Sequence, residues 1–339
     1  MTETFQIESS RVNGDAIHRA AELIRAGGLV AFPTETVYGL GANALDPAAV
    51  GRIFAAKGRP PNNPIIVHVA AIEDAHKLTA DWPPTAQRLA ERFWPGPLTL
   101  VLPKRQCVPE IVTAGAATVG IRVPAHPIAR ALVEAAGLPI AAPSANRSNE
   151  ISPTTAEHVQ KSVGAAVDVI LDGGPTPGGL ESTVLDLTKA PPRLLRPGLV
   201  SPGEIEAVIG PIERGKTVAP DLTAPLSSPG QLPRHYAPRA PMECLASGGR
   251  SRVERLAAEG IQVGWLALGG NQRPIPGATM IAMPSSAVDY ATQLYAALHR
   301  LDDLGVERIV VDLPPDDANW LAVRDRLKRG SIEWVSGGT

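Results

Sequence analysis

The sequence predicts an α/β fold in two parts: an open twisted α/β sheet domain, and a small Rossmann-like α/β domain that follows a Pro-rich linker. Three observations predict this arrangement. Apolar runs of strand length alternate with helical segments over residues 10–210 and again over 241–339, an order typical of α/β domains. Residues 211–240 between them have no periodicity and are rich in Pro, Ser and Gly, as linkers are. The length of 339 residues also exceeds what one core usually organises.

Helices are predicted where apolar residues recur every three to four positions. In residues 15–28 one apolar stripe is formed by Ile17, Ala20, Ala21 and Ile24, and two glycines end it. Asp46 with Pro47 opens a second helix as N-cap and first helical residue. Ser201 and Glu204 have the spacing of a capping box. Further helices are expected within 84–93, 127–137, 154–164, 252–260, 287–305 and 319–331.

Strands are predicted between these helices, from short runs of β-branched and other apolar residues. They are expected within 29–41, 64–70, 98–104, 138–146, 168–174, 182–188, 193–200, 261–270 and 306–313. In 64–70 the alternation places Ile65, Val67 and Val69 on one face, and Ile66 and His68 on the other. His68 is therefore expected to point away from the more apolar face.

Composition excludes several classes of protein. The net charge of −2 argues against a general nucleic-acid or membrane binder. The two cysteines, Cys107 and Cys244, are far apart and have no CxxC or HxxxH companion, so neither a disulfide framework nor a zinc site is expected. We find no signal-peptide pattern at the N-terminus and no apolar run long enough to span a bilayer. These features predict a cytoplasmic protein.

One nucleotide-binding motif is present in an unsuitable context. Residues 210–217 match the P-loop pattern GxxxxGK[ST], with Lys216 and Thr217 at the end. A P-loop works between a strand and a helix, because the loop amides and the helix N-terminus together bind the phosphates. Here a capped helix precedes the motif and two prolines follow it, so we interpret the match as chance.

Polar, rigid segments follow several predicted strands. They contain Thr34, Glu35, Thr36 and Tyr38 in the first segment, Ser144, Asn146 and Ser152 in the second, and Glu181, Ser182 and Thr183 in the third. Singly, each has an alternative interpretation as turn or capping chemistry. Arg122 and Arg196 lie within apolar runs, where an unpaired guanidinium is costly, so each is expected to face an anion or a groove.

Residues 56–68 form a further polar segment, in which Lys57, Arg59 and two asparagines surround three prolines. A solvated loop is the simple alternative interpretation.

We find no GxSxG elbow, no partnered cysteine and no histidine pair with metal spacing. Cations and hydroxyls without a covalent catalyst are what phosphoryl or nucleotidyl transfer requires, with ATP as the source of the reactive bond.

Six motifs in order resemble the YrdC-like family, the threonylcarbamoyl-AMP synthases. They lie at 27–44, 57–69, 93–102, 120–127, 142–154 and 181–188, within a match over about residues 10 to 210. The segment SPGQLPRHYAP followed by a small domain is similar to the two-domain branch of that family. The KxR and SxN signatures stand here as Lys57-Gly58-Arg59 and Ser144-Ala145-Asn146.

The resemblance implies an enzyme that condenses L-threonine, bicarbonate and ATP, with Mg²⁺, into threonylcarbamoyl-AMP and pyrophosphate. The product would pass to the tRNA threonylcarbamoyl-transferase machinery, which modifies an adenosine beside the anticodon. Lys57 and Arg59 would be catalytic. By the resemblance the ATP-binding residues are Lys57, Arg59, Asn63, Thr118, Ser144, Asn146, Ser152 and Arg196. The threonine-binding residues are Thr36, His68, Arg122, Ala142 and Ser182. No protein residue is expected to be a metal ligand.

The resemblance also implies that the linker folds over the pocket and brings Arg234-His235-Tyr236 to the nucleotide. Whether His235 or Tyr236 makes the contact is left open, as are the oligomeric state and the role of the C-terminal domain. Two other functions are compatible with parts of the sequence. One is a double-stranded RNA or tRNA binder that uses Lys57, Arg59, Arg122 and Arg147, and weak RNA binding is compatible with the enzyme as well. The other is carbamoyl transfer in metallocentre maturation, which the missing zinc-finger cysteines disfavour.

Overall fold

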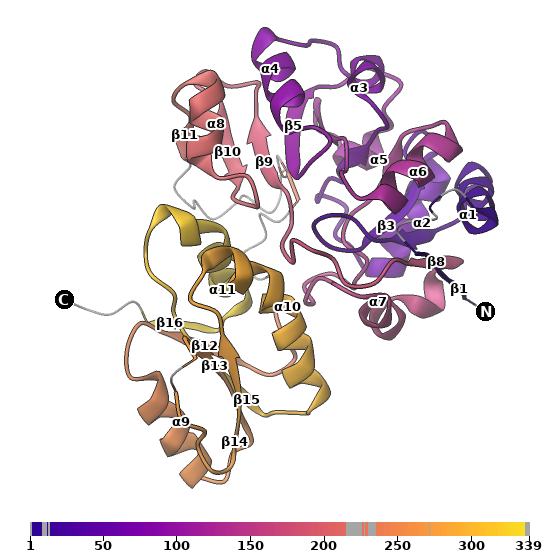
Figure 1. Ribbon diagram of the computed structural model, residues 1–339. Coiled ribbons are helices and arrows are strands. Elements are labelled where there is room, and N and C mark those ends of the chain that lie inside the picture. The colour runs from indigo at the N-terminus through magenta and orange to yellow at the C-terminus, as the bar shows by residue number, and fades with distance from the viewer. Residues whose placement is uncertain are drawn as a thin grey trace. The chain divides into compact units, whose positions relative to one another are not determined.

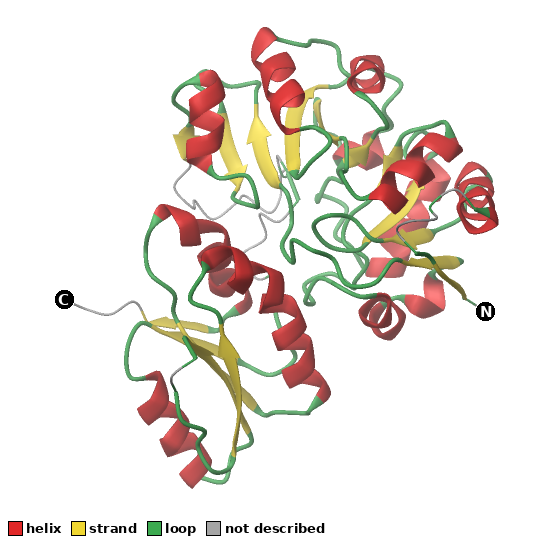
Figure 2. Cartoon of the chain, viewed as in Figure 1, coloured by secondary structure: helices red, strands yellow, loops and turns green. Residues whose placement is uncertain are grey.

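A computed structural model describes residues 2–8, 12, 14–214, 226, 228–229, 235–270 and 272–335. The chain divides into two compact units. The first unit comprises Met1–Ser148, Ser152–Pro177 and Glu181–Leu232, and the second comprises Asn149–Ile151, Gly178–Leu180 and Pro233–Thr339. The prediction of an open-sheet α/β fold in two parts is confirmed (Figures 1 and 2).

The first unit is built on a mixed sheet of 11 strands in the order β1-β8-β2-β3-β7-β4-β6-β5-β9-β10-β11. The strands are β1 (Glu3–Gln6), β2 (Val30–Phe32), β3 (Gly39–Asn43), β4 (Val67–His68), β5 (Leu98–Pro103), β6 (Thr118–Arg122), β7 (Ile140–Ala141), β8 (Val169–Asp172), β9 (Thr183–Asp186), β10 (Arg193–Arg196) and β11 (Glu213–Arg214). β4 pairs with β6 in parallel and with β7 antiparallel. Segments far apart in the sequence therefore converge on the short central strand β4 and its neighbours.

The helices of the first unit are those that the sequence predicts, with three short additions. They are α1 (Asp15–Arg25), α2 (Pro47–Lys57), α3 (Ile72–Leu78), α4 (Pro84–Phe93), α5 (Glu110–Thr113), α6 (Pro127–Ala136), α7 (Ala156–Ser162), α8 (Pro202–Ile209) and the 3₁₀ turn η1 (Gly164–Ala166). The buried residues of α1 are the four of its predicted stripe, packed against α6. The Asp46 carboxylate accepts from the Ala48 amide, and Ser201 and Glu204 form the predicted capping box.

The segment 64–70 is less regular than its alternating pattern predicts. Strand pairing is limited to the two residues of β4, Val67 and His68. The flanking apolar side chains Ile65, Ile66 and Val69 are all buried, so both faces of this segment are covered by protein. Alternation therefore does not separate a buried face from an exposed one here, and His68 is itself buried.

The second unit contains a five-stranded sheet in the order β14-β13-β15-β12-β16, with all pairs parallel. Its elements are β12 (Met242–Leu245), α9 (Gly249–Ala258), β13 (Val263–Leu268), β14 (Ala278–Met283), α10 (Ala287–Asp303), β15 (Arg308–Asp312), the 3₁₀ turn η2 (Ala318–Trp320), α11 (Leu321–Gly330) and β16 (Glu333–Val335). Helix α9 covers one face of the sheet and α10 and α11 cover the other (Figure 1). This is the Rossmann-like layering that the sequence predicts.

An ion-pair cluster surrounds the buried side chain of Glu243 on β12 of the second unit. The Arg252 guanidinium donates from Nε and Nη2 to the two carboxylate oxygens of Glu243, at 2.8 and 2.9 Å. The Nη1 atom of Arg308 lies 3.6 Å from the same carboxylate. The hydrogen bond from Arg252 is the main reason that the pKa of Glu243 is held below its usual value, and it outweighs the opposing effect of burial. Glu243 is therefore an ionised and well-complemented carboxylate.

Two further sequence features are the lack of a long apolar run and the P-loop match. No helix in the described ranges is long and apolar enough to cross a membrane. Within the P-loop match, Glu213 and Arg214 form β11 beside β10, while Lys216 and Thr217 lie outside the described residues.

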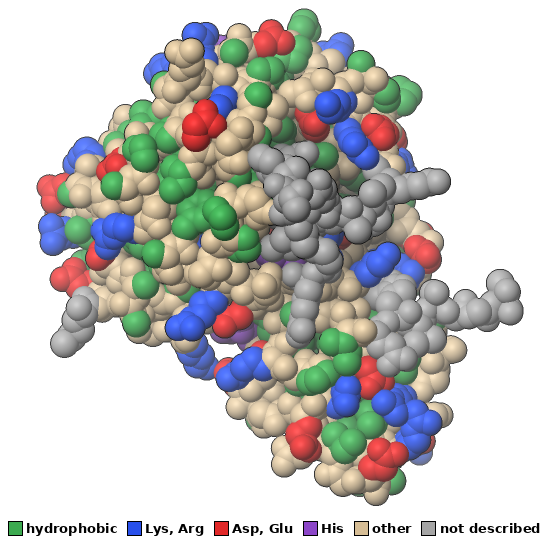
Figure 3. Space-filling view, turned by 180° about the vertical axis from the view of Figure 1, so that it is seen from behind, with side chains coloured by type: hydrophobic (Ala, Val, Ile, Leu, Met, Phe, Trp, Pro, Cys, Tyr) green, Lys and Arg blue, Asp and Glu red, His purple; other side chains and the backbone are tan. Residues whose placement is uncertain are grey.

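On the face seen in Figure 3, Lys and Arg side chains are interspersed with Asp and Glu.

Candidate active site

The polar segment 56–68 begins at the end of α2. Gly58 takes the left-handed conformation, with φ of 57°, and so ends the helix at Lys57. The Lys57 ammonium group is buried and donates to the carbonyl oxygens of Ser144, at 2.6 Å, and of Asn146. The Ser148 amide returns a hydrogen bond to the Lys57 carbonyl. The KxR and SxN segments, far apart in sequence, are thus joined at Lys57.

Arg59 folds back onto its own segment. Its guanidinium donates to the Asn63 carbonyl at 3.0 Å, to the Asn63 side-chain oxygen at 2.8 Å and to the Pro64 carbonyl at 2.6 Å. Both Arg59 and Asn63 are buried. The prolines restrict the backbone of this turn and the Arg59 hydrogen bonds hold it together, so the segment is a structured turn and not a solvated loop.

The register of β4 and β6 places His68 directly beside Arg122. Arg122 is buried, and its guanidinium donates to the Gly96 carbonyl and to the Thr36 hydroxyl, both at 3.2 Å. Its third nitrogen, Nη2, lies 2.5 Å from a carboxylate oxygen of Glu35. Three of the predicted threonine-binding residues, Thr36, His68 and Arg122, are therefore neighbours.

His68 is uncharged in this setting. Burial lowers its pKa from the usual 6.5 to about 3, and the positive charge of Arg122 acts in the same direction. Its ring meets Phe32 edge to face, with centroids 6.3 Å apart. A neutral imidazole beside a guanidinium can hydrogen-bond a substrate without adding a second positive charge.

Ser182 and Arg196 connect the predicted ATP and threonine residues. Arg196 donates to the Ser182 carbonyl at 3.0 and 3.1 Å and to its hydroxyl at 3.1 Å. The same hydroxyl lies 2.8 Å from that of Thr99 on β5. Arg196 is buried, and its partners in the described part of the chain are neutral oxygens, the third being the Pro229 carbonyl. A buried guanidinium with neutral partners is a good binding group for an anion.

The remaining predicted residues of the first unit lie on the same strands or just beyond them. The Ser152 hydroxyl donates to Glu181 at 2.5 Å, and both side chains are buried. The Ala142 amide follows β7 and donates to the Ile66 carbonyl at 3.0 Å. Asn146 is buried and donates to the Arg147 carbonyl, while Ser144 is half-buried and forms a bridge to Gly39.

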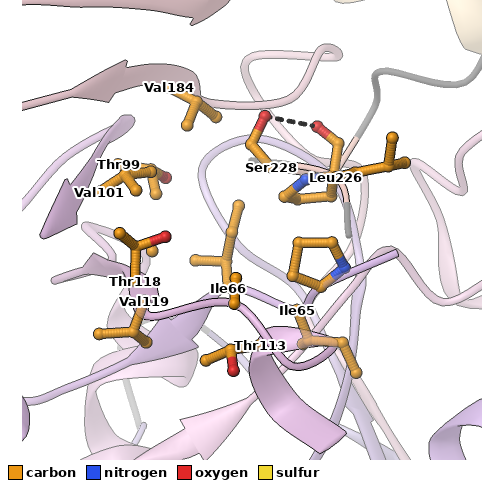
Figure 4. A pocket seen from close by; sticks show the side chains of 14 residues that line it. Ile65, Ile66, Thr99, Val101, Thr113, Thr118, Val119, Val184, Leu226 and Ser228 are labelled. Carbon is orange, nitrogen blue, oxygen red and sulfur yellow. Dashed lines mark hydrogen bonds between the residues drawn. The ribbon is translucent and has the colours of Figure 1, made fainter. Parts of the chain in front are cut away.

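Thr118 lies in a small, largely apolar pocket over β5, β6 and β9 (Figure 4). Its walls include Val101 and Val184 from the sheet, and Ile66, which directly precedes β4. Linker residues Leu226, Ser228 and Pro229 complete the lining. The Leu226 amide donates to the Asn62 carbonyl at 3.0 Å, so part of the linker is bonded to the 56–68 segment.

His235 and Tyr236 belong to the second unit, whereas the predicted site residues from Thr36 to Arg196 belong to the first. The Tyr236 ring lies 5.1 Å from the Arg326 guanidinium and 6.0 Å from the Tyr295 ring, and the His235 amide donates to the Arg329 carbonyl. Tyr236 therefore packs within the second unit. The nucleotide contact of either residue stays a prediction, and Arg234 lies outside the described residues.

In the part of the chain that the structure describes, no group of three or more His, Cys, Asp or Glu side chains is placed to hold a metal ion. The alternative of a double-stranded RNA binder meets a structural limit. Lys57, Arg59 and Arg122 are buried, so they do not form the exposed basic surface that a double-stranded RNA binder needs. Arg147 is exposed.

Comparison with known proteins decides the family. A family model described as telomere recombination matches residues 22–198, and one described as threonylcarbamoyl-AMP synthase, C-terminal domain, matches residues 200–331. The threonylcarbamoyl-AMP synthase of Pyrococcus abyssi is 45% identical over 95% of each chain. That of Bacillus subtilis is 44% identical over 94% of each.

The chain belongs to the threonylcarbamoyl-AMP synthase family. It is an enzyme of the nucleotidyltransferase class, as the sequence resemblance implies. A crystal structure of P. abyssi Sua5 complexed with L-threonine superposes with a TM-score of 0.89 at 43% identity, covering 99% of this chain and 100% of that one. A variant of the same protein with a histidine and a tyrosine changed to alanine gives a TM-score of 0.90 at 41% identity, with complete coverage of both chains.

Within this synthase fold, three polar contacts of the site have no role assigned from sequence. They are the Glu35 carboxylate against Arg122, the Thr99 hydroxyl against Ser182, and Glu181 against Ser152. Glu35 and Glu181 stand out in the sequence only as polar residues after strands, whereas Thr99 sits inside an apolar run and gives no signal. The pairings depend on strand register, which the local sequence does not contain.

Proposed function

We propose that the protein is an L-threonylcarbamoyladenylate synthase that condenses L-threonine, bicarbonate and ATP to threonylcarbamoyl-AMP and pyrophosphate. The observation that carries this proposal is the hydrogen-bonded link between Arg196, assigned to ATP, and Ser182, assigned to threonine. A reaction between two bound substrates needs their sites to adjoin, because correct positioning supplies much of the rate enhancement.

ATP is assigned to the segments joined by Lys57. Lys57 and Arg59 would neutralise the charge that develops on the departing pyrophosphate, with Asn63, Ser144, Asn146, Ser152 and Arg196 as the other polar contacts. The buried guanidinium of Arg196, with neutral partners in the described chain, supports an anionic ligand beside it. The pocket at Thr118 has the apolar walls with a few hydroxyls that suit a nucleobase.

Threonine is assigned to the cluster on β4, β6 and the loop after β2. Arg122 would bind its carboxylate, with Thr36, neutral His68, Ala142 and Ser182 around the rest of the molecule. The threonine amine and bicarbonate would form a carbamate and water. A carbamate oxygen then attacks the α-phosphorus of ATP and pyrophosphate leaves, so no protein nucleophile is needed.

Mg²⁺ would enter with ATP. It binds few protein ligands and prefers phosphate oxygens and water, which fits a site without a cluster of three acidic or histidine ligands among the described residues. When bound, Mg²⁺ would offset negative charge on the triphosphate. The product would pass, in the cytoplasm, to the machinery that transfers the threonylcarbamoyl group to tRNA.

The test is a labelled condensation assay. The protein is incubated with ATP, Mg²⁺, L-threonine and labelled bicarbonate, and we expect pyrophosphate together with a short-lived labelled adenylate. Equal pyrophosphate formation without threonine, or no labelled adenylate, would contradict the proposal. Arg130→Ala, which changes an exposed arginine of α6, serves as the matched control for Arg196→Ala and should leave the rate unchanged.

A further inference from the structure

Glu35 is a buried carboxylate that the chain does not fully complement. Both of its oxygens are shielded from solvent, and in the described part of the chain neither has a hydrogen-bond donor. Its one ion pair among these residues is with Arg122, at 2.5 Å. An ionised carboxylate offers about four acceptor positions, so burial with a single ionic partner leaves most of them unused.

A cation that donates several hydrogen bonds would complement this carboxylate well. An ammonium group has three donors and a positive charge, which matches what the Glu35 oxygens lack. The position is also specific, because Glu35 is beside the guanidinium that is assigned to the substrate carboxylate. An α-amino acid carries its ammonium and carboxylate groups on one carbon, and it can therefore meet an adjacent Glu and Arg at the same time.

We propose that Glu35 binds the α-ammonium group of the amino acid substrate and accepts its proton. This inference rests on the proposed function. The N–H bond of the ammonium breaks, its electron pair stays on nitrogen, and the proton passes to a Glu35 oxygen. The free amine then forms the carbamate with bicarbonate and releases water. The proton leaves Glu35 for solvent when the product departs.

The neighbouring charges are compatible with this role. The charged or titratable groups that interact with Glu35 in the described chain are Arg122 on β6 and His126 at the N-cap of α6. Burial lowers the pKa of His126, against a smaller opposing effect of Glu35, and His68 beside Arg122 has a pKa of about 3. Above neutral pH both histidines are uncharged, so neither competes with an ammonium group for Glu35.

The binding test uses two ligands and Glu35→Gln, which keeps the shape of the side chain and removes its charge. L-Threonine is compared with 3-hydroxybutanoate, which retains the carboxylate and hydroxyl but has no amine. We expect the wild-type protein to prefer threonine, and Glu35→Gln to lose about tenfold or more of its threonine affinity while 3-hydroxybutanoate binds as well as before. Equal loss of both ligands would indicate a merely structural role and would overturn the proposal.

The proton-transfer test is the pH dependence of adenylate formation. Removing a general base typically lowers the rate about 100-fold or more. The deficit of Glu35→Gln should shrink from about pH 7 to about pH 9, as the free amine becomes more abundant in solution. A deficit that does not change with pH would refute the proton-acceptor role.

Two controls separate the possible failures. Glu35→Asp keeps the charge and should retain the preference for threonine over 3-hydroxybutanoate. It serves as the test variant if Glu35→Gln does not fold. Loss of this preference in Glu35→Asp would contradict the proposal. If the wild-type protein neither binds threonine nor forms the adenylate, the proposed function fails. If it does both and Glu35→Gln is indistinguishable from it, only the inference about Glu35 fails.

Discussion

Two clusters of buried charge, one in each unit, have opposite characters. On β12, Glu243 receives two hydrogen bonds from Arg252 and a second cation, and its pKa is lowered accordingly. In the first unit, Glu35 has oxygens without donors in the described chain, and Arg196 on β10 has neutral partners there. A complemented cluster stabilises the fold, whereas an incomplete one is suited to binding charged ligands.

The largest expected effect is on catalysis. Arg196→Ala removes a buried cation assigned to ATP, and we expect kcat/KM for ATP to fall about 100- to 1000-fold, the usual loss for one charge-stabilising group. Lys57→Ala should have an effect of the same order, since it also disconnects the segments at Ser144 and Asn146. Steady-state pyrophosphate release measures both. If the kinetics of either variant are unchanged, the substituted residue is not part of the ATP site.

The next effect should be on stability and not on activity. Arg252→Ala leaves the buried Glu243 carboxylate with only the weaker interactions of Arg308 and Arg255, and we expect a loss of about 3 kcal/mol in unfolding free energy. Chemical denaturation measures this loss. Arg250→Ala is the matched control, because Arg250 is a half-buried residue of the same helix whose ion pair with Glu254 is on the surface. Equal destabilisation by the two changes would show that the β12 cluster has no special role.

A third effect concerns pH. The folded-state pKa of His68 is about 3 and its ordinary value is 6.5, so between these values the unfolded chain binds a proton that the folded chain does not. The contribution of His68 to stability therefore falls as pH is lowered below 6.5, by about 2 kcal/mol between pH 7 and pH 5.

His68→Gln removes this contribution and should make the pH dependence of unfolding shallower. Denaturant titrations at several pH values provide the measurement. His18→Gln, at an exposed position on α1, should retain the wild-type slope. A wild-type slope in His68→Gln would mean that His68 is protonated in the folded protein.

The smallest effect is expected at the start of the 56–68 segment. Gly58→Ala forces a side chain into a left-handed conformation and should cost about 1 kcal/mol, although the space around it is open. Gly51→Ala lies inside the same helix, where an added methyl group meets ordinary contacts, and should stabilise by about 0.5–1 kcal/mol. Thermal unfolding compares them. Equal changes in thermal unfolding for the two variants would mean that the left-handed backbone conformation at Gly58 does not determine the bend.

Local features of the fold were predictable from neighbouring residues. The stripe of α1, the Asp46 cap and the Ser201–Glu204 capping box are of this kind, and all are confirmed. The outlying strand β1 was missed because three of its four residues are polar and it pairs only with β8. The length of the strand at 64–70 was overestimated, because burial on both faces conceals where pairing stops.

For the candidate site, the sequence indicated which side chains need a partner but not which contacts they make. Arg122 and Arg196 stood out because a guanidinium within an apolar run needs a partner. Their partners could not be named, since the pairing of Arg122 with Glu35 depends on strands β2, β4 and β6 meeting in one sheet. Long-range register of this kind is decided by the whole fold and not by adjacent residues.

The most direct test of the contrast between the two clusters is the shift in unfolding temperature caused by Mg·ATP and L-threonine. A ligand that binds the folded state raises this temperature according to its affinity. We predict a clear rise for the wild-type protein and for Arg252→Met, with most of the ATP-dependent rise lost in Arg196→Met. A full shift in Arg196→Met, or loss of the shift in Arg252→Met, would contradict the account.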